Sequence, residues 1–137
     1  MMLIRKIITG LLLLLSSNLL FAQWVSIASS GDRGGYSVYV DPDSGVSIGD
    51  TINYWFLYDF KKLQKTAASS YLSYEIQLEI NCNKQISRIL RSIDYLDHMG
   101  LGKPFRTSCE AQNWMPLNPF SKDEIIWSIA CPAYPTT

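Results

Sequence analysis

The chain has 137 residues, of which 12 are basic and 12 are acidic, so its formal net charge is zero. Residues 1–22 contain two basic residues and no acidic one, so the rest of the chain has 10 basic and 12 acidic residues, a net charge of 10 − 12 = −2. Nucleic-acid-binding domains carry a clear basic excess, so this charge argues against that class. The 137 − 22 = 115 residues that follow are enough for one domain.

Residues 1–22 have the layout of a secretory signal peptide. Arg5 and Lys6 come first, an apolar run follows through residues 11–15, and Ala22 offers a cleavage point after a polar break. An uncleaved membrane anchor is the alternative, but the apolar run is short against the ~20 residues that a span needs. Cleavage predicts a protein that is periplasmic, outer-membrane-associated or secreted. In such oxidising compartments cysteines form disulfides.

Turn signals divide the next part of the chain into short segments. We expect strands over Gln23–Ser29, Tyr36–Asp41 and Thr51–Phe60, the last of them rich in β-branched and aromatic residues. The polar stretch 61–69 is predicted to be a loop.

The clearest strand is Leu72–Cys82. Apolar and polar residues alternate along it, with Leu72, Tyr74, Ile76, Leu78, Ile80 and Cys82 at the even positions and Ser73, Glu75, Gln77, Glu79 and Asn81 at the odd ones. Such alternation indicates one buried face, and Cys82 points to it.

Residues 84–97 are predicted to form a fifth strand, since the preceding "NCNK" resembles a hairpin connection. A helix is the alternative, because Ile86, Ile89, Leu90 and Ile93 also fit a 3.6-residue stripe. A weaker sixth strand is expected over residues 103–109. The predicted class is α+β, a single antiparallel sheet of about six strands with a C-terminal helix packed on one face.

The strand Thr51–Phe60 carries large apolar residues on both faces. Its even positions form one apolar row, while Trp55 and Leu57 point the other way. A sheet covered on one side should have a polar opposite face, so a second cover is expected. A long loop, a second subunit or a ligand would each provide it.

The segment Ser121–Pro132 is predicted to be that terminal helix. Ser121 and Glu124 are spaced as a capping box, and Pro132 stops the helix. Ile125, Ile126 and Ile129 form an apolar stripe with Trp127 at its flank, so this face must dock on the sheet.

The helix ends at Cys131, and Cys82 on the buried face of the sheet is its natural partner. A bridge between them would close a loop of about fifty residues, worth roughly 4 kcal/mol in the chain-entropy model. Cys109 is the rival partner for either cysteine. If it is left over, it is a free thiol or forms an intermolecular bridge.

Four stretches in this order resemble the surface-adhesin protein E family of Gram-negative bacteria: "YVDP", "INYWFLYDFK", "EINCNKQISRIL" and "DEIIWSIAC". The resemblance covers the chain from about Trp24 to Cys131 and places a surface-adhesin E-like domain over residues 23–137. It implies an antiparallel sheet with a C-terminal helix held by a Cys82–Cys131 disulfide, a homodimer, and binding of host vitronectin, laminin and plasminogen. The chain departs from the family's lipid-anchored adhesin, since no cysteine follows Ala22, and Cys109 is an addition to the two-cysteine pattern.

We find no catalytic motif, no phosphate-binding glycine loop and no metal-ligand spacing, so we expect no enzyme, no cofactor and no metal site. His98 is expected to be a solvated loop residue. Lys61, Lys62 and Lys65, which follow two aromatic residues, are candidate contacts for an acidic partner. Trp55 and Leu57 are the other candidate partner-binding residues.

The leading interpretation is an exported, non-enzymatic binding protein, adhesin-like by resemblance, whose partners are host extracellular-matrix or serum proteins. A small periplasmic ligand carrier and a structural or assembly accessory of the cell envelope are the alternatives. A stable dimer would favour the first class, and a monomer that copurifies with a small molecule would favour the carrier.

Overall fold

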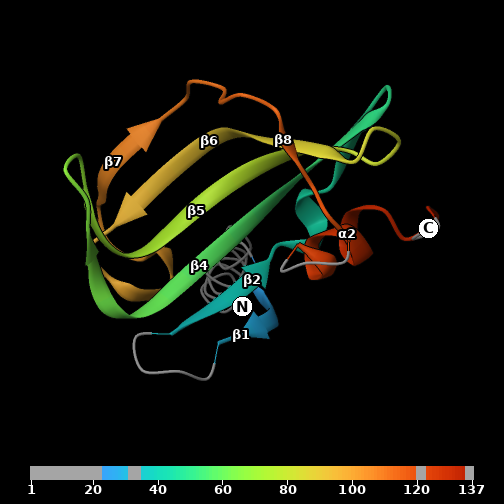
Figure 1. The fold of residues 1–137 in the computed structure, drawn as a ribbon. Coiled ribbons are helices and arrows are strands. Elements are labelled where there is room, and N and C mark those ends of the chain that lie inside the picture. The colour runs from blue at the N-terminus through green and yellow to red at the C-terminus, as the bar shows by residue number, and fades with distance from the viewer. Residues whose placement is uncertain (1–22, 31–34, 120–122, 135–137) are drawn as a thin grey trace, which may run out of the picture.

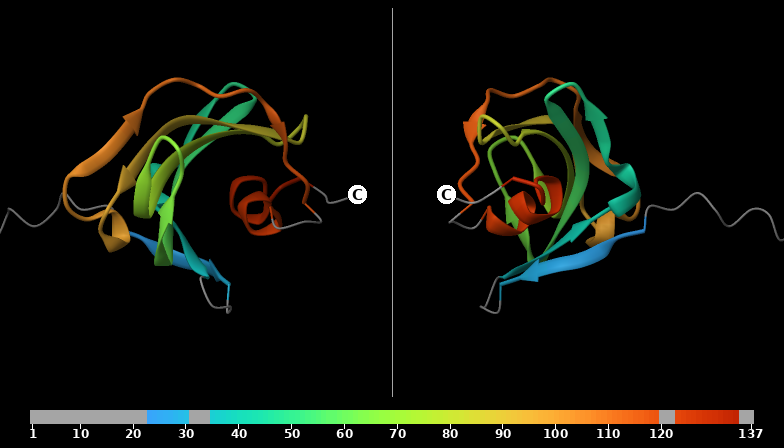
Figure 2. Two further views of the ribbon diagram at one scale, coloured as in Figure 1. Left: turned by 60° about the vertical axis from the view of Figure 1, so that its left-hand side comes forward. Right: turned by 90° about the vertical axis from the view of Figure 1, so that its right-hand side faces the viewer.

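The computed structural model describes residues 23–30, 35–119 and 123–134. The predicted signal peptide and the predicted cap Ser121 lie outside these residues. A strongly curved antiparallel sheet wraps around one short helix, α2 (Glu124–Ala130), which lies in the hollow of the sheet (Figures 1 and 2). No helix in the described ranges combines the length and apolarity needed to cross a bilayer.

The sheet has eight strands rather than six. The main order is β1-β2-β4-β5-β6-β7, while β3 pairs with β4 and β8 pairs with β6. The strands are β1 (Val25–Ser29), β2 (Tyr36–Val40), β3 (Val46–Ile48), β4 (Thr51–Lys65), β5 (Ser70–Asn81), β6 (Ile86–Tyr95), β7 (Pro104–Ser108) and β8 (Met115–Pro116). Two single-turn 3-10 helices, η1 (Pro42–Ser44) and η2 (His98–Gly100), lie in connections.

The two additional strands are too short to show a periodic pattern. Their presence follows from the length of their neighbours, because a long strand needs hydrogen-bond partners beyond the end of a short one. β2 pairs with residues 56–60 of β4, so β3 pairs with residues 51–53. In the same way β7 pairs with one end of β6 and β8 with the other.

The predicted loop over residues 61–69 is wrong for its first half, because β4 continues to Lys65. The β4–β5 register breaks between Asp59 and Gln64 and then resumes, with Gln64 opposite Tyr71. The hairpin closes at Thr66, whose Oγ1 accepts hydrogen bonds from the backbone N–H groups of Ala68 and Ser69 at 3.3 and 3.0 Å. Lysines and glutamine suit this part of β4 because its side chains are exposed or half-buried.

The strand prediction for residues 84–97 is confirmed, and a bulge explains why a helix competed with it. Gln77 of β5 lies opposite Arg91 and Leu78 lies opposite Ile89, so Leu90 is an extra residue in β6. An extra residue shifts the alternation by one position. The apolar residues of β6 therefore no longer recur at every second position, and their spacing resembles that of an apolar stripe on a helix.

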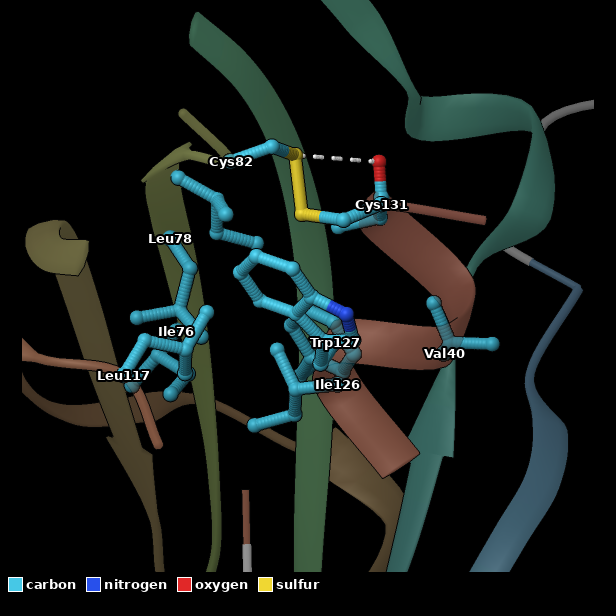
Figure 3. Packing of buried hydrophobic residues seen from close by; sticks show 11 residues of the cluster. Val40, Ile76, Leu78, Cys82, Leu117, Ile126, Trp127 and Cys131 are labelled. Carbon is cyan, nitrogen blue, oxygen red and sulfur yellow. Dashed lines mark hydrogen bonds between the residues drawn. A yellow bond between two sulfur atoms is a disulfide. The ribbon is translucent and has the colours of Figure 1, made fainter. Parts of the chain in front are cut away.

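The predicted docking of the helix is confirmed. α2 packs on the concave face of the sheet, and the disulfide Cys82–Cys131 joins the end of β5 to the end of α2 with the two Cα atoms 5.6 Å apart (Figure 3). Trp127, expected at the flank of the apolar stripe, lies in the core instead and is only 3% exposed. The buried cluster around it comprises Val40, Phe56, Ile76, Leu78, Ile80, Cys82, Leu117, Ile126, Trp127, Ala130 and Cys131. Cys109 is a free, exposed thiol.

The convex face has its own cover near Leu57. The turn η2 lies against β4 and β5 at this point, where Asp59 Oδ1 accepts a hydrogen bond from the Met99 N–H at 2.8 Å. Ser73 Oγ donates to the Asp97 carbonyl at 2.6 Å and accepts from the Gly100 N–H at 2.9 Å. The second face of β4 was expected to be covered by a loop, a second subunit or a ligand. A loop is therefore the cover that buries Leu57.

Candidate binding surface

The residues predicted to bind a partner do not form one patch. Lys61, Lys62 and Lys65 are exposed along the last part of β4. Trp55 is half-buried, and Leu57 is completely buried beneath η2, so its side chain offers no surface to a partner. Only the lysines lie close together in sequence on one exposed stretch.

The three lysines lie on the β4–β5 hairpin, whose green turn is at the left-hand end of the sheet in Figure 1. Leu63, which is 45% exposed, lies among them. The hairpin is fastened at both strands, because the Lys61 N–H donates to the Gly35 carbonyl at 3.0 Å and Ser69 Oγ donates to Asp94 Oδ2 at 2.6 Å. The structure thus presents a basic surface with one exposed apolar side chain on an anchored hairpin, which we call the lysine hairpin (residues 61–69).

A second surface, which the sequence reasoning missed, lies on the concave face. α2 has seven residues and is therefore about 10 Å long, whereas the fifteen residues of β4 extend over about 50 Å. Cys131 directly follows α2, so the disulfide holds the C-terminal end of the helix beside Cys82. The helix therefore leaves the opposite end of the concave face, near the β4–β5 hairpin, uncovered. The uncovered end carries aromatic residues from three strands: Tyr36, Tyr58, Phe60, Tyr71 and Tyr74.

These aromatic rings contact one another. Tyr58 and Tyr74 are stacked with their centroids 4.9 Å apart, and Phe60 lies 5.6 Å from Tyr74 and 5.7 Å from Tyr36. A cleft of about 390 Å³ lies between four of these rings and the start of α2; its lining includes Tyr36, Tyr58, Phe60 and Tyr74 on one side and Asp123, Ile125 and Ile126 on the other. We call this space the aromatic cleft.

The cleft keeps its tyrosines uncharged. Burial raises the pKa of Tyr58 to about 12, and the neighbouring Tyr36 and the negative charge of Asp123 act in the same direction. Burial also raises the pKa of Tyr74, with smaller contributions from Tyr58 and Tyr71. Both side chains therefore stay protonated at alkaline pH values at which an ordinary tyrosine loses its proton.

A signal for this cleft is present in the sequence. The apolar row of β4 continues past Phe56 to Tyr58 and Phe60, and a terminal helix of two turns is too short to cover such a row. Comparing the length of the helix with the length of the strand would have indicated an uncovered aromatic end.

Two polar side chains outside these surfaces, His98 and Asp94, contact neighbouring segments. His98 is exposed, and its Nδ1 lies 3.1 Å from Asp59 Oδ1. Asp94 accepts the hydrogen bond from Ser69. Among the residues that the structure describes, no three His, Cys, Asp or Glu side chains gather as they would around a metal ion.

The curved antiparallel sheet, the helix in its hollow and the strand-to-helix disulfide define a small, covalently clamped domain of the α+β class. Residues 24–132 match the family described as Surface-adhesin protein E. This match spans most of the chain, and the protein belongs to the surface-adhesin protein E family.

Two solved structures of Haemophilus influenzae protein E have the same fold. Crystal form II of that protein is 18% identical in sequence with a TM-score of 0.58, and the match covers 80% of this chain and 98% of the other. A further structure of it is 16% identical with a TM-score of 0.55 and covers 82% and 98%. No curated protein sequence matches the chain.

Proposed function

We propose that this protein is exported and acts as a non-enzymatic, adhesin-like binding module. The match of residues 24–132 to a family of surface adhesins carries this proposal. The build of the domain supports it, since a sheet clamped to its helix by a disulfide suits an oxidising environment outside the cytoplasm. The partners that the family resemblance implies are host extracellular-matrix or serum proteins, with vitronectin, laminin and plasminogen as the ones to test.

Cell-surface display is the first point to test, because a product confined to the periplasm cannot meet a host protein. We expect a protease added to intact cells to degrade the protein, while a soluble periplasmic marker in the same cells stays whole. Protection that ends only when the outer membrane is permeabilised would contradict the adhesin role and favour the envelope accessory or the carrier.

The lysine hairpin is the surface that we assign to a protein partner. It is exposed, basic and anchored, and an exposed leucine lies among its charges. Charged groups at the rim of an interface mainly speed association and make binding depend on salt. We therefore expect binding of immobilised vitronectin, laminin or plasminogen to weaken as the salt concentration rises.

Charge reversal tests this assignment. The variant with Lys61→Glu and Lys62→Glu should bind the partner about tenfold more weakly, a loss of ~1.4 kcal/mol. The matched control carries Lys84→Glu and Arg91→Glu, which change the net charge equally at exposed positions outside the hairpin. Equal losses in both variants would show that only the net charge matters and would remove the hairpin from the proposal.

Homodimerisation stays a prediction of the family resemblance. The residues that suggested it from the sequence were Trp55 and Leu57, and the burial of Leu57 beneath η2 leaves Trp55 as the only one of the two with any exposed surface. Sedimentation of the protein at several concentrations measures the mass directly. A dimer that the substitution Trp55→Ser dissociates would assign the interface to this face.

A further inference from the structure

Three exposed apolar side chains lie close together in the chain beside the edge strand β7. They are Leu96, Leu101 and Phe105, and all three lie between the end of β6 and the second residue of β7. Leu101 is 61% exposed and Phe105 is 50% exposed. Neighbouring apolar side chains that a fold leaves in water commonly mark a surface that binds another molecule.

The connection that carries these side chains is fixed on the sheet. Tyr95 at the end of β6 lies opposite Pro104 at the start of β7. Between them the turn η2 is bonded to the sheet, because the Met99 N–H donates to Asp59 Oδ1 and the Gly100 N–H donates to Ser73 Oγ. The apolar side chains are therefore presented by an ordered connection, so binding through them does not first have to order the chain.

Phe105 is exposed because of a bulge. Asp94 of β6 lies opposite Arg106 and Tyr95 lies opposite Pro104, so Phe105 is an extra residue in β7. An extra residue of this kind turns its side chain away from the regular alternation, and such bulges are frequent at sheet edges and beside functional sites. The bulge thus places an aromatic ring at the edge of the sheet.

The outer edge of β7 is open. β7 is the last strand in the main order of the sheet, and in the described part of the chain it pairs with β6 alone (Figure 1). Pro104 stands at its first position, where a proline leaves the backbone groups of the following residues available. An open edge can accept an extended segment as a further strand, with affinity from main-chain hydrogen bonds and specificity from the neighbouring side chains.

Two basic side chains decide which kind of segment fits this edge. Lys103 and Arg106 are exposed, and neither forms an ion pair with another residue that the structure describes. Asp94, opposite Arg106, accepts a hydrogen bond from Ser69. Two copies of β7 paired edge to edge would bring these positive charges together, which disfavours a second copy as the added strand. A segment with acidic residues is attracted instead.

We propose that the outer edge of β7 binds an extended segment of a partner protein as an added strand. Acidic side chains of this segment face Lys103 and Arg106, and an apolar side chain covers Phe105 and Leu101. We call this surface the β7 edge site (residues 101–108). It does not depend on the lysine hairpin or on the adhesin role, because it rests on the edge strand and its own side chains.

The experiment is a titration of the exported protein with synthetic peptides, followed by backbone amide resonances and hydrogen exchange. The probes are a short blocked peptide of alternating glutamate and valine, the same peptide with lysine in place of glutamate, and the glutamate peptide methylated on every backbone nitrogen. We expect the first to shift the resonances of residues 104–108 and to slow their exchange. It should bind about tenfold more tightly than the lysine peptide.

The methylated peptide separates strand addition from attraction between side chains. It keeps the charges and the apolar groups but cannot donate backbone hydrogen bonds, so it should leave exchange in β7 unchanged.

Two variants with matched controls locate the site. Phe105→Ser and Arg106→Gln should each weaken binding of the glutamate peptide by about three- to tenfold. Met115→Ser removes an exposed apolar side chain from β8, which pairs with the other end of β6, and Arg91→Gln removes an exposed charge from β6 itself. Both controls should bind like the wild type. All four side chains are exposed, so the fold should persist, as unchanged resonances far from each substitution will show.

The proposal is overturned if the glutamate peptide does not bind, if the lysine peptide binds as tightly, if the methylated peptide also slows exchange in β7, or if the variants bind like their controls. It is also overturned if the protein self-associates in sedimentation and Phe105→Ser abolishes this, because the edge then holds a second copy. Binding of the glutamate peptide at β7 together with no binding of vitronectin, laminin or plasminogen supports the β7 edge site and rejects only the adhesin role.

Discussion

At the scale of single residues, the turn η2 shows how a few atoms cover the convex face. Gly100 has a left-handed backbone conformation with a φ of +64°, and a Cβ atom at this position would lie 2.5 Å from Glu75 Oε1. The turn also places Leu57 under cover and donates hydrogen bonds to the sheet, from the Met99 N–H to Asp59 Oδ1 and from the Gly100 N–H to Ser73 Oγ. Glycine is therefore favoured here for its conformation, and an added Cβ would require the Glu75 carboxylate, the end of a flexible side chain, to move.

The substitution Gly100→Ala should lower the free energy of unfolding by about 2–3 kcal/mol, because strain in the backbone adds to a contact with Glu75. Gly49→Ala is the matched control, since Gly49 has a φ of +58° and no atom within 4 Å of the added Cβ. It should lose only about 1 kcal/mol. Urea denaturation of the two variants measures the difference, and equal losses would show that the contact with Glu75 is relieved at no cost.

At the scale of elements, α2 is too short to be stable as a helix on its own. A helix of seven residues is far below the length at which isolated helices are stable in water, so packing and the disulfide must maintain it. The bridge Cys82–Cys131 joins residues separated by 49 positions. The helix therefore depends on a covalent link to the sheet that it covers.

The substitution Cys131→Ser should destabilise the protein by about 4 kcal/mol, because the unfolded chain regains the entropy of an open loop of that length. Cys109→Ser, which changes the free exposed thiol, should leave the melting temperature unchanged. A reducing agent should lower the stability of the wild type to that of Cys131→Ser and leave the variant unaffected. An unchanged melting curve for Cys131→Ser would show that packing alone holds the helix.

A buried hydroxyl is one of the two groups that fasten the lysine hairpin at its base, beside the hydrogen bond from Lys61 to Gly35. Ser69 is 7% exposed, and it donates to the carboxylate of Asp94 on β6. Hydrogen bonds to charged groups contribute about 1.5–3 kcal/mol. We therefore expect Ser69→Ala to lower the free energy of unfolding by about 1–2 kcal/mol and to speed amide hydrogen exchange in residues 61–69.

The control for this change is Ser47→Ala, at an exposed serine on β3, which should alter neither quantity. If Ser69→Ala changes global stability while exchange in the hairpin stays slow, the hydrogen bond does not anchor the hairpin.

At the scale of the whole molecule, the buried tyrosines couple the stability of the fold to alkaline pH. Burial raises the pKa of Tyr58 to about 12 and also raises that of Tyr74, whereas tyrosines of the unfolded chain titrate near pH 10. The folded protein therefore holds these protons more tightly than the unfolded chain. The contribution of these two tyrosines to stability should be constant below about pH 9 and be lost as the pH rises from about 10 toward 12.

The variant Tyr58→Phe tests this coupling, since it keeps the ring and removes one titrating group. Its free energy of unfolding should fall less steeply above about pH 10 than that of the wild type. Tyr134→Phe, at an exposed tyrosine, should behave like the wild type. If the free energy of unfolding of Tyr58→Phe falls with pH as steeply as that of the wild type, groups other than Tyr58 cause the loss of stability at alkaline pH.

The parts of the fold that could be predicted from the sequence are those set by local periodicity. Alternation along Leu72–Cys82 identified a strand and the face on which Cys82 lies, and the stripe of α2 identified its docking face. These two faces favoured Cys82–Cys131 with Cys109 as the rival partner, the family resemblance implied the same pair, and the structure confirms it. β3, β8 and the extension of β4 escaped prediction because each exists only through pairing with a distant segment.

The candidate site was predicted only in part, for the same reason. Lys61, Lys62 and Lys65 were identified from composition and lie on an exposed hairpin, although on a strand and not in a loop. Leu57 was correctly placed on the second face, but its neighbours in space decide whether it is accessible, and η2 buries it. The aromatic cleft depends on how far a short helix extends over a long sheet, so its signal appears only when the lengths of these two distant elements are compared and not in the pattern of either one.

By itself the sequence indicated the class of the fold and the strand and helix that carry Cys82 and Cys131, because side-chain periodicity acts within single elements, and four stretches in order indicated the surface-adhesin family by resemblance. Only the tertiary structure decided which segments cover each face of the sheet: η2 on the convex side, and α2 over no more than one end of the concave side. Covering a face requires segments far apart in the chain to meet at a definite register, and that register follows from packing of the whole molecule.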